Sequence, residues 1–93
     1  MSEFERKVRI VNELGLHARA ASKLVQLAAK FSVEIKVGHD ELMVNAKSIM
    51  GVLMLAASKG TDLLLIAIGE QDEAKAALDA LSALIADRFG EGK

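Results

Sequence analysis

The distribution of apolar and polar residues along the chain predicts four β-strands. Residues 4–11 alternate between apolar and charged side chains, and this period of two is typical of a strand with one buried face. Residues 33–44 alternate in the same way on both sides of a turn at residues 38–40, so they predict a β-hairpin. Residues 63–68 are continuously apolar between two glycines, which indicates a central strand covered on at least one face.

Three other segments carry apolar residues every three or four positions, which is the spacing of an amphipathic helix. They cover residues 18–31, residues 48–58 and residues 72–89. Ser48 is a suitable N-cap for the second of these helices, which should end before Gly60. The predicted order is therefore β-α-β-β-α-β-α. Two split β-α-β units followed by a helix indicate an α+β fold, with an antiparallel sheet covered by helices on one side.

Length and composition limit the possible functions. We expect the 93 residues to form a single domain spanning residues 1–93. The net charge of -1 argues against a nucleic-acid partner, and an aromatic content of 3% leaves little material for stacking bases. The chain contains no cysteine, which excludes disulfides and thiolate metal sites. Because its first residues are polar and no apolar run reaches about 18 residues, we expect no membrane insertion and a cytoplasmic location.

We expect His17 to occupy the first position of a helix, directly after a turn at residues 12–15. Amide hydrogens in the first turn of a helix have no intrahelical partners, and together with the helix dipole they form an anion site. We therefore expect the backbone of Ala18, Arg19 and Ala20 to form a phosphate cradle beside the imidazole, with the Arg19 side chain adding positive charge. The same positive field disfavours the imidazolium form, and an uncharged ring has a lone pair that can act as a nucleophile.

The histidines and the acidic residues also have purely structural interpretations. His17 can begin a helix without any chemistry, and spacing alone does not separate the two roles. His39 lies in the predicted hairpin turn and is interpreted as a surface residue without chemistry. Asp72 and Glu73 match the placement of negative charge at a helix start. Since no acidic cluster has the spacing of metal ligands, the sequence predicts no metal and no cofactor.

Two motifs carry a resemblance to a known family. The first is Gly-Leu-His-Ala-Arg at residues 15–19 with Ala21, and the second is Lys-Ser-Ile-Met-Gly-Val at residues 47–52. They resemble the active-site motif and the regulatory serine region of HPr, the phosphocarrier family of the bacterial phosphoenolpyruvate-dependent sugar phosphotransferase system. Length, element order and the separation of the two motifs agree with that family, so the resemblance covers nearly the whole chain.

The resemblance implies a phosphocarrier that is not itself an enzyme. HPr proteins accept a phosphoryl group from phospho-Enzyme I on Nδ1 of a histidine and pass it to the IIA domains of sugar permeases. His17 matches this histidine, and Arg19 matches the arginine that stabilises the phosphate. The fold implied is an open-faced sandwich of four antiparallel strands in the order 1-4-2-3 with three helices on one face. A carrier that presents one face to several partners is expected to be a monomer.

Ala20 departs from the family motif, which usually has proline directly after the arginine. Proline is tolerated in the first turn of a helix because an amide there has no partner, so we expect alanine to preserve the transfer chemistry. The departure leaves open whether the partner is the sugar-branch Enzyme I or a paralogue. A regulatory member of the same family, in a nitrogen-related or signalling phosphorelay, is therefore one alternative. A small RNA- or metabolite-binding module is the alternative from a different class.

Ser48 has both a structural and a functional interpretation. As a helix N-cap it contributes about 1 kcal/mol of stability. The resemblance implies that Ser48 is the regulatory serine, which an HPr kinase/phosphorylase phosphorylates in hosts that have this enzyme. A phosphate there adds about -1.5 to -2 charge, and we expect it to slow phosphoryl transfer to His17.

Large apolar residues follow one another closely on the second predicted helix, which is too short to bury them all. Methionine in particular suits contact surfaces that must adapt to several partners. The resemblance implies partner docking around this helix and the helix that follows His17. Ile49 and Met50 are the predicted docking residues, and Leu53 and Lys23 are further candidates.

Overall fold

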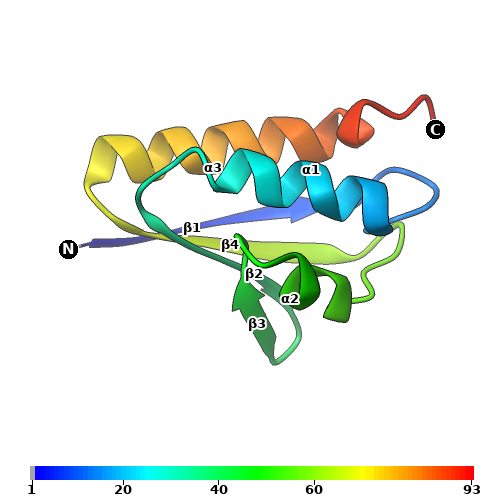
Figure 1. Ribbon diagram of the computed structural model, residues 1–93, viewed down its shortest axis with the longest axis horizontal. Coiled ribbons are helices and arrows are strands. Elements are labelled where there is room, and N and C mark those ends of the chain that lie inside the picture. The colour runs from blue at the N-terminus through cyan, green and yellow to red at the C-terminus, as the bar shows by residue number, and fades with distance from the viewer. Residues whose placement is uncertain (1) are drawn as a thin grey trace.

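The computed structural model describes residues 2–93 and contains one four-stranded antiparallel sheet with the strand order β1-β4-β2-β3 (Figure 1). The predicted order of elements and the strand order implied by the family resemblance are thereby confirmed. No helix within these residues is long and apolar enough to cross a membrane. The elements are β1 (Ser2–Arg9), α1 (Ala18–Ala28), β2 (Glu34–His39), β3 (Leu42–Asn45), α2 (Ile49–Met54), β4 (Asp62–Gly69), α3 (Gln71–Ala86) and the short 3₁₀ turn η1 (Arg88–Gly90).

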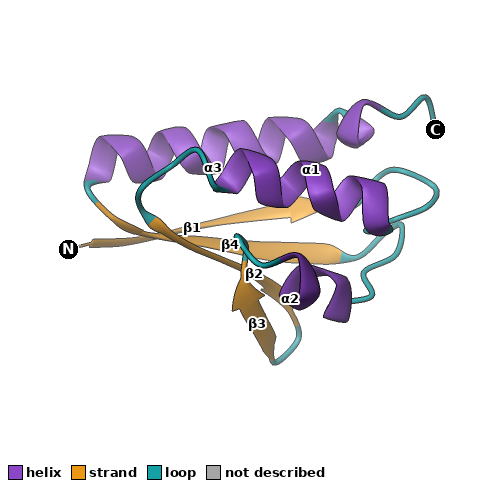
Figure 2. Ribbon diagram, viewed as in Figure 1, coloured by secondary structure: helices purple, strands orange, loops and turns teal. Residues whose placement is uncertain are grey.

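The helices cover one face of the sheet and leave the other face open. Figure 2 shows α1 and α3 side by side along the strands, while the short α2 packs against α1 and β3. β4 is the central strand predicted from its apolar run, because it pairs with β1 on one side and with β2 on the other. Its helix-facing residues Leu63, Leu65 and Ala67 are fully buried, whereas the residues that alternate with them are partly exposed.

The hydrophobic core lies between the sheet and the two long helices. Alanines on the inner faces of these helices allow close packing, and each fully buried leucine or isoleucine contributes about 1.5–3 kcal/mol. The inner faces predicted from the helical spacing are confirmed, although Leu27, Phe31 and Leu84 are only partly buried. The buried residues are Ala20, Ala21, Leu24 and Ala28 of α1, and Ala74, Ala77, Leu78, Leu81 and Ile85 of α3.

The turn of the hairpin lies later in the chain than predicted. Gly38 and His39 belong to β2, and the turn consists of Asp40 and Glu41. Asp40 takes a positive φ of 54°, a conformation that aspartate tolerates better than most residues. Gly38 serves close strand packing, because a Cβ at this position would overlap the Leu42 carbonyl oxygen. The glycine that suggested a turn is therefore required inside a strand.

The second helix is much shorter than predicted. It ends at Met54 rather than at Ser58, because Ala56 has a positive φ of 48°, which an α-helix does not allow. The chain then turns toward the loop between β1 and α1, where the Ala57 carbonyl accepts a hydrogen bond from the Leu16 amide at 2.8 Å. Tertiary contact with that loop therefore replaces the last turns of the predicted helix.

The third helix also ends earlier than predicted, at Ala86 rather than at Phe89. Arg88, Phe89 and Gly90 follow with positive φ values of 57°, 55° and 77°. The Phe89 side chain is fully buried, which anchors this left-handed segment to the core. As Figure 1 shows, the last residues consequently lie at the same end of the molecule as the loop between β1 and α1.

Candidate functional site

The loop between β1 and α1 holds His17 at the N-terminus of α1. The loop is braced by the Asn12 side chain, whose Nδ2 donates to the Gly15 carbonyl at 2.9 Å. Gly15 has a φ of 66°, and a Cβ there would lie 2.5 Å from the Ala57 carbonyl oxygen, so only glycine fits without displacement. His17 is the N-cap rather than the first helical residue, with extended backbone and no capping bond from its side chain.

The amides at the start of α1 have no internal partners. Among the described residues, the first α1 amide that finds an acceptor is that of Ala21, which donates to the His17 carbonyl at 2.8 Å. The preceding amides of Ala18, Arg19 and Ala20 have no acceptor within residues 2–93. The helix begins with no acidic residue in its first turn, so its own first turn leaves the positive end of the helix dipole uncompensated. The sequence predicted these unpaired amides at the start of the helix, and their role as a phosphate cradle stays a prediction.

Glu91 is a site residue that sequence reasoning missed. Its Oε2 contacts Nε2 of His17, and its Oε1 accepts a hydrogen bond from Asn12 Nδ2 at 2.9 Å. Arg19 Nε lies 3.8 Å from the same Oε2 atom. His17 and Glu91 are 74 positions apart, and no local pattern relates them, because their contact depends on the path of the chain after α3.

The electrostatic environment of Glu91 keeps its carboxyl group ionised. Partial burial, which by itself would raise the pKa, is outweighed by the hydrogen bonds from Asn12 and His17 and by the nearby charge of Arg19, so the pKa of Glu91 is lowered. The sequence argument for an uncharged His17 ring considered only the positive field of the helix. Since the Glu91 carboxylate opposes that field, the uncharged ring stays a prediction.

The Arg19 side chain lies near Glu91 without a hydrogen bond to it. Its side chain is 65% exposed, and its only carboxylate contact within the described residues is the 3.8 Å approach to Glu91. Because this distance is longer than a hydrogen bond, the guanidinium keeps its donors available. The unpaired amides of α1 and the positive charge of Arg19 thus both belong to the first turn that follows His17.

Ser48 is the N-cap of α2, as predicted, and its Oγ accepts a hydrogen bond from the Gly51 amide at 3.2 Å. The large apolar residues of the helix it caps are exposed: Ile49 is 38% exposed, Met50 70% and Leu53 36%. Met54, at 67%, completes this surface, which we call the α2 patch. The predicted docking residues of α2 are thus accessible.

Lys23, the remaining docking candidate, has another contact. Its Nζ donates to the Phe89 carbonyl at 2.6 Å, and therefore ties α1 to the segment that follows α3.

Leu14, in the loop that leads to His17, is 65% exposed and was not singled out by the sequence. An apolar residue in a turn follows no periodic pattern, so its exposure becomes evident only in the structure.

His39 is not the exposed turn residue that was predicted. It lies in β2 with its side chain partly buried, where Nε2 contacts the Leu55 carbonyl at 2.8 Å and Nδ1 contacts Asp40 Oδ2 at 3.2 Å. The hydrogen bond to Leu55 and the contact with Asp40 outweigh desolvation and raise the pKa of His39. Its role is to connect the hairpin to the end of α2.

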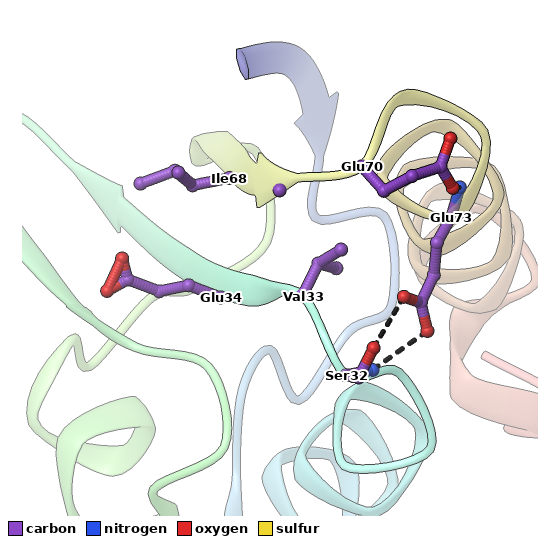
Figure 3. Close-up of a pocket in the computed structure, with 7 residues that line it drawn as sticks. Ser32, Val33, Glu34, Ile68, Glu70 and Glu73 are labelled. Carbon is purple, nitrogen blue, oxygen red and sulfur yellow. Dashed lines mark hydrogen bonds between the residues drawn. The ribbon is translucent and has the colours of Figure 1, made fainter. Parts of the chain in front are cut away.

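The acidic residues at the start of α3 stabilise the fold. Glu70 is the N-cap and accepts from the amides of Asp72 and Glu73. Figure 3 shows the adjoining pocket, in which the Glu73 carboxylate accepts from the Ser32 amide at 2.9 Å and from the Ser32 hydroxyl at 2.5 Å. Within residues 2–93, no group of three or more acidic or histidine side chains could hold a metal ion.

The chain is similar to known proteins over nearly its full length. Residues 4–87 match the family described as the PTS HPr component phosphorylation site. The phosphocarrier protein HPr of Cupriavidus necator is 51% identical over 89 residues, which cover 96% of this chain and 98% of that protein. The phosphocarrier protein NPr of Shewanella violacea is 45% identical over 91 residues, which cover 98% of both proteins.

Solved structures of HPr proteins are also similar to this chain. HPr-C-His from Thermoanaerobacter tengcongensis matches with a TM-score of 0.89 and 47% identity, over 97% of this chain and 99% of that one. A structure of an HPr dimer from the same organism matches with a TM-score of 0.74 and 49% identity, over 90% of this chain and 94% of that one. Both the family match and the identities extend over nearly the full chain. The protein therefore belongs to the HPr family of phosphocarrier proteins of the phosphotransferase system, whose members carry phosphoryl groups rather than catalyse a reaction of their own.

Proposed function

We propose that His17 accepts a phosphoryl group from phospho-Enzyme I and passes it to the IIA domains of sugar permeases. The observation that carries this proposal is the placement of the imidazole at the N-cap of α1, beside three backbone amides without internal acceptors. Arg19 adds a positive charge, since its Nε lies 3.8 Å from the Glu91 oxygen that contacts the imidazole. Donors that are already in place stabilise developing negative charge without having to rearrange.

The transfer requires no cofactor on the carrier. In the proposed step the lone pair of Nδ1 attacks phosphorus, an N–P bond forms, and the bond between phosphorus and the donor breaks with its electron pair remaining on the donor. The phosphoryl oxygens then accept hydrogen bonds from the backbone of Ala18, Arg19 and Ala20 and from the Arg19 side chain. Transfer to an IIA domain is the same step in reverse, with the acceptor supplying the lone pair.

The test is phosphorylation by purified Enzyme I with magnesium and labelled phosphoenolpyruvate. The protein should acquire an acid-labile, alkali-stable label, as expected for phosphohistidine, and His17→Ala should acquire none. His39→Gln is the matched control, since it removes the other histidine and should retain the label. Label that persists in His17→Ala would contradict the proposal.

A second candidate is phosphotransfer in a nitrogen-related branch of the same system. It is favoured by the similarity to an NPr and by Ala20 in place of the usual proline. Labelling reactions with the sugar-branch Enzyme I and with its nitrogen-branch paralogue, compared at equal concentrations, separate the two. The faster reaction identifies the branch. The RNA- or metabolite-binding alternative does not fit membership of a phosphocarrier family.

We further propose that the α2 patch, with Leu14, is the surface on which Enzyme I and IIA domains dock. Large apolar residues grouped on a surface helix are typical of such sites, and the exposed methionines can adapt to more than one partner. Contacts of this kind are modest in size and transient. Because the patch must remain accessible, we propose that the carrier acts as a monomer, which sedimentation at working concentration would test.

A further inference from the structure

We infer that Met50 and Met54 form a redox-sensitive site on the α2 patch: oxidation of their thioethers to sulfoxides by a peroxide weakens partner docking, and reduction restores it. The inference rests on the proposed docking role of the α2 patch and adds a means of regulating it. It starts from the exposure of the two side chains, which is 70% for Met50 and 67% for Met54.

The chain contains few side chains that a mild oxidant attacks. It has no cysteine, tryptophan or tyrosine, so the thioethers of its four methionines are its most readily oxidised groups. Three of these methionines, Met43, Met50 and Met54, lie within the described residues. The accessibility of each of the three side chains to a small peroxide molecule therefore decides where oxidation occurs.

The packing of α2 turns two of these methionines toward solvent. Val52 is fully buried, and a Cβ at Gly51 would lie 3.2 Å from Cβ of Val44 in β3, so this side of the helix faces the sheet. Positions four apart lie on the same face of a helix. Met50 and Met54 are four apart and highly exposed, so they lie side by side on a face that points away from β3.

Met43 has a different environment and serves as an internal reference. It pairs with Gly38 across β2 and β3, and its Sδ would lie 2.5 Å from a Cβ at Gly38, so the sulfur packs against that glycine. Neighbouring residues of a strand point to opposite faces. Because Val44 faces α2, Met43 lies on the open face of the sheet with its side chain partly buried. Oxidation should therefore be slower at Met43 than at Met50 or Met54.

The oxidation step transfers one oxygen atom from the peroxide to sulfur. The sulfur lone pair attacks a peroxide oxygen, an S–O bond forms and the O–O bond breaks. Sulfur is oxidised by two electrons, and the departing hydroxide takes the proton of the transferred hydroxyl group and leaves as water. Methionine sulfoxide reductases return the product to methionine, with one enzyme for each epimer. The modification is therefore reversible.

A sulfoxide at either position opposes docking. Its oxygen is a hydrogen-bond acceptor, and water satisfies it in the free protein because the side chain is exposed. An apolar partner surface that covers the patch removes that water without supplying a donor, and burial of an unpaired polar group is costly. Neither side chain contributes to the hydrophobic core. We thus expect oxidation to weaken docking and to leave the free energy of unfolding nearly unchanged.

The test treats the protein with hydrogen peroxide at neutral pH and follows each methionine by peptide mass spectrometry. Met50 and Met54 should each gain an oxygen before Met43 does. The Michaelis constant for the carrier in phosphorylation by phospho-Enzyme I should then rise about tenfold, while the rate at saturating carrier changes by less than about twofold. Treatment with methionine sulfoxide reductases should restore the original Michaelis constant.

Two variants separate this site from other effects of peroxide. The double variant Met50→Leu with Met54→Leu keeps apolar side chains of similar volume, and peroxide should not change its own Michaelis constant. Met43→Leu is the matched control, because it retains both reactive sulfurs and should respond to peroxide as the wild type does.

Two results would overturn the inference while the untreated protein is labelled on His17. One is oxidation of Met43 as fast as that of Met50 and Met54. The other is a Michaelis constant that stays constant after Met50 and Met54 have been oxidised. Absence of label on the untreated protein is a different result, which contradicts the proposed function of His17 itself.

Discussion

Three kinds of group belong to the site of His17, and they come from two parts of the chain. The unpaired amides and the Arg19 side chain belong to the first turn of α1, whereas Glu91 comes from the segment after α3. The amides and Arg19 lie near His17 because they are its neighbours along the chain. Glu91 is present only because the tail folds back, so the site depends on both local and long-range structure.

Substitution of Ala20 by proline should have little effect on phosphorylation. Its amide has no acceptor within the described residues, so Ala20→Pro removes no hydrogen bond, and we expect the rate of phosphorylation by Enzyme I to remain within about tenfold of the wild type. Ala21→Pro is the contrasting variant, because the Ala21 amide donates to the His17 carbonyl. Loss of that bond should destabilise α1 by about 3 kcal/mol. An Ala20→Pro protein that is phosphorylated more than tenfold faster would refute the prediction.

The α2 element shows how the environment of a helix limits its length. Ser48 supplies the N-cap, but the contact of Ala57 with the loop before His17 ends the helix after six residues. A helix this short cannot bury all of its apolar side chains, which explains the exposure of Met50 and Met54. The apolar side chains of the α2 patch are exposed because the helix is short.

Phosphorylation of Ser48 would place negative charge at the edge of that patch, and Ser48→Asp imitates it. We expect phosphorylation by Enzyme I to slow by about tenfold or more, because a partner that docks on the apolar α2 patch would have to bury this charge without a counter-charge, which is strongly unfavourable. Aspartate caps a helix about as well as serine, so the free energy of unfolding should change little. Stopped-flow or quench kinetics and urea titration measure the two effects separately.

Ser2→Asp is the control for that prediction. It adds the same charge on exposed β1, at the opposite end of the molecule from the C-terminal segment, and should leave the rate unchanged. An equal rate in Ser48→Asp and the wild-type protein would show that charge at this cap does not regulate transfer.

At the scale of the whole molecule, the two ends of the sandwich have different roles. One end brings together the loop of His17 and the C-terminal segment, while the other joins α3 to the loop before β2 through Glu73 and Ser32 (Figures 1 and 3). Carboxylates at the second end are engaged by backbone and hydroxyl donors of the fold. We therefore expect substitutions there to change stability without changing phosphotransfer.

The pH dependence of the stability of a Glu73 variant tests that expectation. Hydrogen bonds from Ser32 lower the pKa of Glu73 below its ordinary value of 4.5. A carboxyl group whose pKa is lower in the folded state stabilises the fold above its ordinary pKa, and this contribution is lost as the pH falls through the folded-state pKa. Glu73→Gln should thus be less stable than the wild type at pH 7, by a margin that shrinks as the pH falls below 4.5.

Urea unfolding at neutral and acidic pH measures the change in that margin. Glu41→Gln provides a matched control, because Glu41 is exposed in the β2–β3 turn and no side-chain hydrogen bond to it is present within residues 2–93. A Glu73→Gln margin that is constant with pH would contradict the assignment of the stabilising contact. Labelling of His17 in the same variant should match the wild type.

Local patterns were sufficient for much of this protein. The period of two in the strands and of three to four in the helices predicted the order of elements and the buried faces of α1 and α3, since these depend on which side chains leave water. The same patterns predicted His17 at the start of a helix, although it is the N-cap rather than the first helical residue. The strand order came from the family resemblance, because alternation along a strand does not specify its neighbours.

Tertiary contacts determined the ends of two helices and the long-range contact at the site. The early ends of α2 and α3 depend on left-handed residues at Ala56, Arg88 and Phe89, which no helical pattern reveals because the sequence spacing continues past them. The contact between Glu91 and His17 spans 74 positions, and burial of Phe89 and the Lys23 bond hold the segment that brings the two residues together. Sequence by itself determined which residues could form the site, and the folded chain determined which carboxylate faces the imidazole, because that choice depends on packing between segments that are distant along the chain.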